Sequence, residues 1–107
     1  MTRALVGLVT CGSRAEARRV AAALLAARAA ACVNILGGLE SHYWWQGRRE
    51  QSREWLLLIK TTTARRAAVV RLVRREHRYD VPEIIFLPVV AGERRYLTWL
   101  RTQVAGR

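Results

Sequence analysis

One stretch, residues 32–61, limits what this chain can fold into. It holds two apolar and aromatic runs that flank Gln46-Gly47-Arg48, with no proline between them. A glycine between two such runs indicates a β-hairpin. Each arm of about fourteen residues would span roughly 45 Å at about 3.3 Å per residue. A compact domain of this length is only about 34 Å across. The hairpin must therefore bend or extend beyond its own domain.

An extended hairpin tip would carry large aromatic side chains into solvent. Exposed strands with large apolar groups are an aggregation hazard, and burial against another copy of the chain removes it. We therefore expect a homo-oligomer with Tyr43, Trp44, Trp45 and Trp55 at its interface. Base stacking, as in proteins that bind single-stranded nucleic acid, is the less favoured role for these rings. We also expect Trp55 to cover Gly38 across the hairpin.

The rest of the chain alternates strands and helices. We expect strands at 3–10, 31–45, 48–61 and 83–90, and helices at 14–30, 64–76 and 93–104. Ser13 and Glu16 predict a capping box at the first helix, and the three threonines at 61–63 predict a cap for the second. Gly37-Gly38 predicts a bulge, and Pro88 places the last strand at a sheet edge or bulge. The order β-α-β-β-α-β predicts a ferredoxin-like α+β fold, a single domain over residues 1–107.

The formal net charge of +11 first suggests nucleic acid. Lys60 is the only lysine, however, and alanine is abundant, which is typical of GC-rich coding rather than of a binding surface. The arginines are also spread along the chain instead of forming one stripe. We therefore expect nonspecific attraction to anions, and nonspecific nucleic-acid binding is the least favoured of the alternative functions.

The sequence contains no apolar run of the roughly eighteen residues that a membrane span requires. The short apolar run at the N-terminus stops at a glycine and lacks the pattern of a signal peptide. We therefore expect a cytoplasmic protein that does not enter a membrane. In that compartment Cys11 and Cys32 are expected to stay reduced, and Cys11 is expected to be inert.

Five short blocks, in a fixed order over nearly the whole chain, together resemble one protein family. The blocks are Ala30-Ala31-Cys32-Val33-Asn34-Ile35, Ser41-x-Tyr43-x-Trp45-x-Gly47, Glu54-x-x-Leu57-Leu58-Ile59-Lys60-Thr61, His77-x-Tyr79-x-Val81-Pro82-Glu83-Ile84 and Tyr96-Leu97-x-Trp99-Leu100. In this pattern the chain resembles the CutA divalent-cation-tolerance proteins.

The resemblance implies a ferredoxin-like subunit in a tight homotrimer, related in fold to the PII signalling proteins, which bind ligands between subunits. It implies a role in tolerance of copper and other divalent cations, with no required cofactor. The copper ligands proposed for the family correspond here to Cys32, His77 and Glu83. A thiolate, an imidazole and a carboxylate together suit copper or zinc better than magnesium or calcium. We therefore predict a binding or signalling module that responds to metal ions.

Other interpretations of these residues stay open. Arg78 stands where the family often has proline, and its charge opposes cation binding beside His77. Together with Lys60 it could instead attract a small anion to a cleft between subunits, which is the alternative function. Cys32 is also typical of a small core residue. As a nucleophile, Cys32 would need His77 as base and a third orienting group that the sequence does not reveal. We therefore expect no enzymatic activity.

Overall fold

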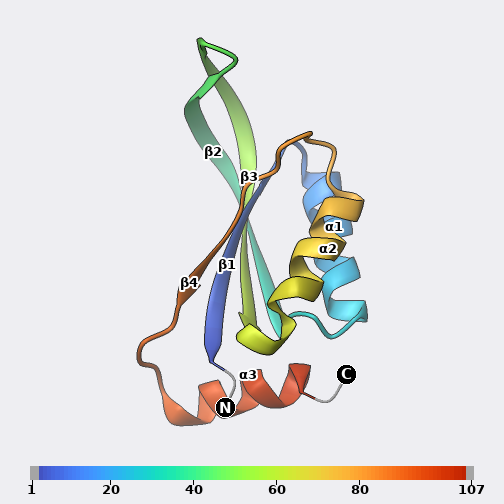
Figure 1. The fold of residues 1–107 in the computed structure, drawn as a ribbon, viewed down its shortest axis with the longest axis vertical. Helices are drawn as coiled ribbons and strands as arrows, with labels where there is room; N and C mark the ends of the chain where they lie inside the picture. Colours follow the sequence, from blue (N-terminus) through green and yellow to red (C-terminus); the bar gives the residue numbers. More distant parts are fainter. Residues whose placement is uncertain (1–2, 106–107) are drawn as a thin grey trace.

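The computed structural model describes residues 3–105. Its elements follow the chain as β1 (Ala4–Cys11), α1 (Arg14–Ala26), β2 (Cys32–Trp45), β3 (Arg48–Thr62), η1 (Thr63–Arg65), α2 (Arg66–Glu76), β4 (Ile84–Pro88) and α3 (Arg94–Val104). The strands form one antiparallel sheet in the order β2-β3-β1-β4. Helices α1 and α2 lie on one face of it, and α3 lies across its lower end (Figure 1). The predicted ferredoxin-like α+β fold is confirmed.

The first helix begins as the sequence predicts. The Ser13 hydroxyl accepts a hydrogen bond from the Glu16 amide at 3.1 Å. The Glu16 carboxylate bonds to the amide of Gly12, at 3.0 Å, instead of to the amide of Ser13. The helix ends at Ala26, four residues earlier than predicted, and Arg28 follows with a φ of 52°. That left-handed backbone is incompatible with a continuing helix.

The threonine triplet does not cap the second helix in the predicted way. The Thr61 side chain is fully buried and donates to the carbonyl of Ala29 at 2.6 Å. The Thr63 hydroxyl accepts a bond from the Arg3 amide. The short turn η1 then separates the triplet from α2. These threonines therefore attach the end of β3 to neighbouring segments, and the prediction of a cap was wrong.

The hydrophobic core lies between the sheet and the two helices that cover it. Its fully buried members alternate along β1 and β3 and recur at helical spacing along α1 and α2, as each period requires. The largest of them are Val9, Val20, Leu24, Leu57, Ile59, Val69 and Val73. Buried alanines at 17 and 68 let α1 and α2 approach the strands closely, and Ala29 and Ala30 are buried in the connection that follows α1.

The β2–β3 hairpin extends beyond the helices, as Figure 1 shows at the top of the view. The molecule is 44 Å long but only 26 and 22 Å in its other two dimensions. The predicted bulge is present, because the strand register shifts between Leu36 and Leu39. Trp55 covers Gly37 instead of the predicted Gly38, since a Cβ on Gly37 would lie 2.9 Å from the indole nitrogen.

Two edges and part of one face of the sheet are uncovered within residues 3–105, since α3 packs against β1 and β3 only at the lower end of that face. The edge strands are β2 and β4, and β4 ends at Pro88, as predicted for an edge. The register places Leu36, Ile85 and Leu87 on the face away from α1 and α2, where they are 57%, 49% and 50% exposed. No helix in the described part of the chain has the length and hydropathy that a membrane-spanning helix needs.

We predict that Thr61→Val destabilises the fold by about 1–3 kcal/mol, because it leaves the buried Ala29 carbonyl without its donor. Urea unfolding followed by circular dichroism measures the change. Thr102→Val is the matched control, because the Thr102 hydroxyl is exposed and bonds within its own helix. The control should stay within about 0.5 kcal/mol of the wild type. Equal effects of the two substitutions would contradict the prediction.

Candidate functional site

The residues predicted to bind metal do not converge within one chain. Cys32 begins β2 and pairs with Lys60 on β3, which pairs in turn with Val6 on β1. The ring of His77 lies against Thr10, four residues further along β1. Four residues of strand span about 13 Å. In addition, β3 lies between β2, which carries Cys32, and β1, against which His77 lies. A site that contains both Cys32 and His77 therefore needs Cys32 from a second subunit, and this stays a prediction.

His77 is held inside its own chain. Its side chain is fully buried, and Nε2 lies 2.6 Å from the carbonyl oxygen of Thr10. Since a carbonyl only accepts, Nε2 carries the proton of this bond. The other ring nitrogen, Nδ1, accepts the amide of Tyr79 at 3.1 Å. Nδ1 also lies 3.8 Å from Oε2 of Glu16.

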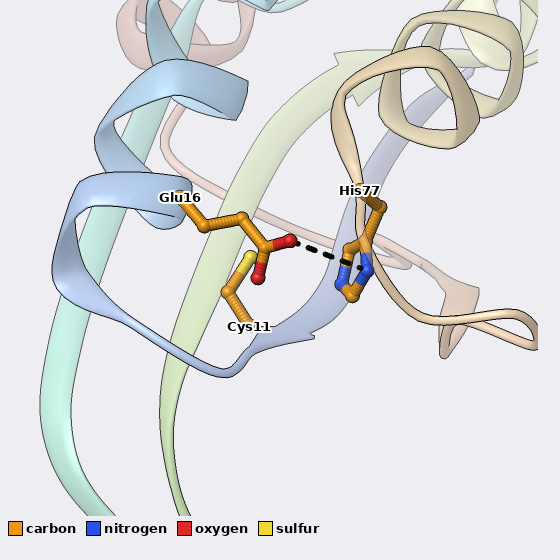
Figure 2. Close-up of side chains that lie close together, drawn as sticks. All are labelled: Cys11, Glu16 and His77. Atoms are coloured by element: carbon orange, nitrogen blue, oxygen red, sulfur yellow. Dashed lines mark ion pairs between the residues drawn. The ribbon is translucent and has the colours of Figure 1, made fainter.

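Figure 2 shows a group that the sequence did not reveal, made of Cys11, Glu16 and His77. One ligand atom from each lies within 4.8 Å of the others, and no other such group of three occurs among residues 3–105. Burial, followed by the charge of Glu16, raises the pKa of the Cys11 thiol to about 12. Glu16 accepts amide bonds from Gly12 at 3.0 Å and from Arg78 at 2.6 Å. We name these three residues the buried cluster.

A second group lines a cavity of about 710 Å³ between the hairpin and the segment that leads into β4. We name this cavity the carboxylate cavity, because five of the eight acidic residues of the chain line it. These residues are Glu40, Glu50, Glu54, Asp80 and Glu83. Of the predicted metal ligands, only Glu83 lies here. The sequence reasoning missed the other four, because they are far apart in the chain.

The environment of the carboxylate cavity disfavours further negative charge. Glu54 is 6% exposed and accepts the hydroxyl of Tyr79 at 2.8 Å. Burial and the nearby charge of Glu54 raise the pKa of Glu83. Burial, together with the bond to Glu54, also raises the pKa of Tyr79. Both pKa shifts have the sign expected where burial and a neighbouring carboxylate disfavour negative charge.

The aromatic residues predicted for an oligomer interface occupy different places. Tyr43 and Trp45 line the carboxylate cavity, and Trp44 is 71% exposed beside them. Trp55 instead packs against the core of its own chain. That these four rings contact another subunit stays a prediction.

The residues predicted to attract an anion are separated in one chain. Lys60 donates a hydrogen bond to the Asn34 side chain, near Cys32. Arg78 is exposed, and its amide bonds to Glu16 near the other end of the sheet. Lys60 is also remote from Glu83. Lys60 pairs with Val6 on β1, Val6 pairs with Leu87 on β4, and Leu87 comes four residues after Glu83 in the chain. An anion site between subunits stays a prediction.

Comparisons with known proteins agree on one family. Residues 5–103 match the model of the CutA1 divalent ion tolerance protein. The chain is 49% identical over 96 residues to the divalent-cation tolerance protein CutA of Thermus thermophilus, covering 90% of this chain and 93% of the relative.

Solved structures give the same result. A divalent cation tolerance protein from Thermus thermophilus superposes with a TM-score of 0.93 at 46% identity, covering 95% of this chain and 99% of that one. A protein from Archaeoglobus fulgidus, described as a periplasmic divalent cation tolerance protein, gives 0.89 at 34% identity, covering 97% and 99%. The cytoplasmic location expected from the sequence therefore stays a prediction. The match of the family model over nearly the whole chain, together with these relatives, shows that the chain belongs to the CutA1 family of divalent ion tolerance proteins.

Proposed function

We propose that this protein binds divalent metal ions in the carboxylate cavity and acts as a binding or signalling module, not as an enzyme. One observation carries the proposal. Five of the eight acidic side chains gather around one cavity in a chain whose net charge is +11. The names of the relatives, which refer to tolerance of divalent cations, support the same class of ligand. Copper is the ion that the sequence predicts.

The chemistry of the cavity suits a cation. A divalent ion near Glu54 and Glu83 would offset the cost of holding the buried charge of Glu54 near the charge of Glu83. His42 also lines the cavity and lies 2.7 Å from a carboxylate oxygen of Glu40. Imidazole and carboxylate ligands together are accepted by copper(II) and zinc. The cavity is much larger than one ion, so bound water or a second subunit would complete the coordination.

We further propose that the functional unit is a homotrimer. The edges formed by β2 and β4 differ from each other, so the β4 edge of one subunit can lie beside the β2 edge of the next. Such a head-to-tail contact leaves no free edge once a ring closes. Three subunits are what the family resemblance implies. The apolar sheet face that carries Leu36, Ile85 and Leu87 would be buried in the interior of the ring.

We predict that copper(II) binding, measured by calorimetric titration, weakens by about tenfold or more in the double variant Glu54→Gln, Glu83→Gln, the scale of change seen when metal sites lose a supporting carboxylate. The glutamine at position 54 can still accept the Tyr79 hydroxyl, so the cavity should keep its shape. Glu76→Gln is the control, since Glu76 pairs with Arg19 and does not line the cavity.

Cys32→Ser distinguishes metal binding in the carboxylate cavity from metal binding by the ligands that the sequence predicted. We expect this variant to bind copper(II) like the wild type. Copper binding that Cys32→Ser abolishes and the double variant retains would show that the predicted thiolate site operates instead of the carboxylate cavity.

We predict that Glu83→Gln raises the thermal stability of the metal-free protein at pH 7 but not at pH 4. The pKa of Glu83 is raised above its ordinary 4.5, so the neutral form is the one that the fold favours. Its stabilising contribution is complete below pH 4.5 and is lost as the pH rises through the higher folded value. Glutamine has no charge to bury at any pH. A stability difference that did not change with pH would contradict the assignment.

We predict that removing the hairpin tip abolishes the trimer. Because Ser41 pairs with Ser52, residues 42–51 can be replaced by Asn-Gly without changing the register. The wild type should elute with three times the 12.2 kDa chain mass in size-exclusion chromatography with light scattering. The shortened chain should give monomers or aggregate. A shortened chain that remains trimeric would remove the hairpin from the assembly contacts. A wild type that is a stable monomer would refute the trimer itself.

A further inference from the structure

The buried cluster brings together three kinds of metal ligand from three parts of the fold. Cys11 ends β1, Glu16 lies in the first turn of α1, and His77 follows α2. Figure 2 shows the three side chains pointing toward one another. None of them lines the carboxylate cavity. Whatever the cluster binds is therefore separate from the ion of the proposed function.

The imidazole of His77 is arranged as a metal-ligating histidine would be. Nε2 donates its proton to the main-chain carbonyl of Thr10, which fixes the ring and its tautomer. Histidines that bind metals almost always donate their other ring nitrogen to a carbonyl, a carboxylate or water in this way. Nδ1 is left with its lone pair, which now accepts the Tyr79 amide at 3.1 Å. This bond is the one that a metal would replace.

The electrostatics of the cluster also call for a positive charge. The lone pair of Nδ1 lies 3.8 Å from Oε2 of Glu16, and the two side chains are 0% and 2% exposed. Two electron-rich groups thus lie close together in a buried place, where their repulsion is only weakly screened. The two amides on the Glu16 carboxylate offset part of its charge. A cation next to Nδ1 and Oε2 would offset the rest.

We propose that Cys11 Sγ, the Glu16 carboxylate and His77 Nδ1 form a second metal site, selective for a thiophilic divalent ion such as zinc. Binding forms a metal–sulfur bond and breaks the Cys11 S–H bond, and the proton leaves to the buffer. No electron is transferred. The thiolate and the carboxylate together balance the two positive charges, so the buried centre is neutral. Such neutrality is what makes a buried ionic site tolerable.

The site needs little movement to close. Zinc bonds of about 2.0–2.3 Å in a tetrahedral site place ligand atoms about 3.3–3.8 Å apart. The three ligand atoms already lie within 4.8 Å of one another. Side-chain shifts of about 1 Å therefore bring them to bonding distance, and a water can take the fourth position.

Cobalt(II) is the probe that tests the site, because cobalt bound to a thiolate has a charge-transfer absorption that carboxylate and histidine ligands alone do not produce. Titration of the reduced wild type, without oxygen, should give a saturable charge-transfer band that zinc removes. Cys11→Ala should abolish the band. Cys32→Ser is the matched control, since it removes the other of the two cysteines, and it should keep the band. The Glu54→Gln, Glu83→Gln variant should keep it as well.

Two further measurements cover the case in which Cys11→Ala fails to fold. Glu16→Gln removes the charge and keeps one of the two oxygens that accept the Gly12 and Arg78 amides. It should keep the band while weakening cobalt binding by about tenfold or more. Calorimetry in two buffers should show one proton released per metal from the Cys11 thiol. A wild type without the band, or a band lost in Cys32→Ser, would overturn the proposal.

Discussion

The buried carboxylate of Glu16 holds together the part of the structure on which both candidate sites depend. It accepts the amide of Gly12, where β1 ends, and the amide of Arg78, in the connection between α2 and β4. Hydrogen bonds to an ionised acceptor are about twice as strong as neutral ones. One side chain thus closes the turn before α1 and, together with the His77–Thr10 and Tyr79–Glu54 bonds, fixes the connection after α2. That connection carries Tyr79 to Glu54 and Glu83 to the carboxylate cavity.

The fold was predictable because its information is local and periodic. Alternating and helical spacings identified the strands and helices, and the length of the hairpin arms required an extension beyond the domain. The errors occurred where tertiary contacts decide. The end of α1 depends on the backbone of Arg28, and the threonine triplet depends on the buried carbonyl of Ala29. Trp55 covers Gly37 because the bulge shifts the strand register by an amount that composition does not reveal.

The candidate sites were much less predictable. The carboxylate cavity combines residues from both hairpin arms with Asp80 and Glu83, and only the hairpin register and the path of the connection into β4 bring them together. Glu16 is joined to His77 across about sixty residues of chain, and Cys11 gave no signal apart from its type. Sequence reasoning identified His77 and Glu83 through the family resemblance. It could not show that His77 belongs to the buried cluster and Glu83 to the carboxylate cavity.

The two unlike edges of the sheet have a consequence for how copies of the chain can associate. A head-to-tail contact rotates each subunit by the same angle relative to the one before it. A ring of three subunits closes only if this angle is one third of a turn. The rotation depends on the angle between β2 and β4, which the twist across four strands sets. The bulge at Gly37 and Gly38 increases the local twist of β2. In such a head-to-tail assembly, the same pair of glycines would help to decide between a closed ring and an open filament.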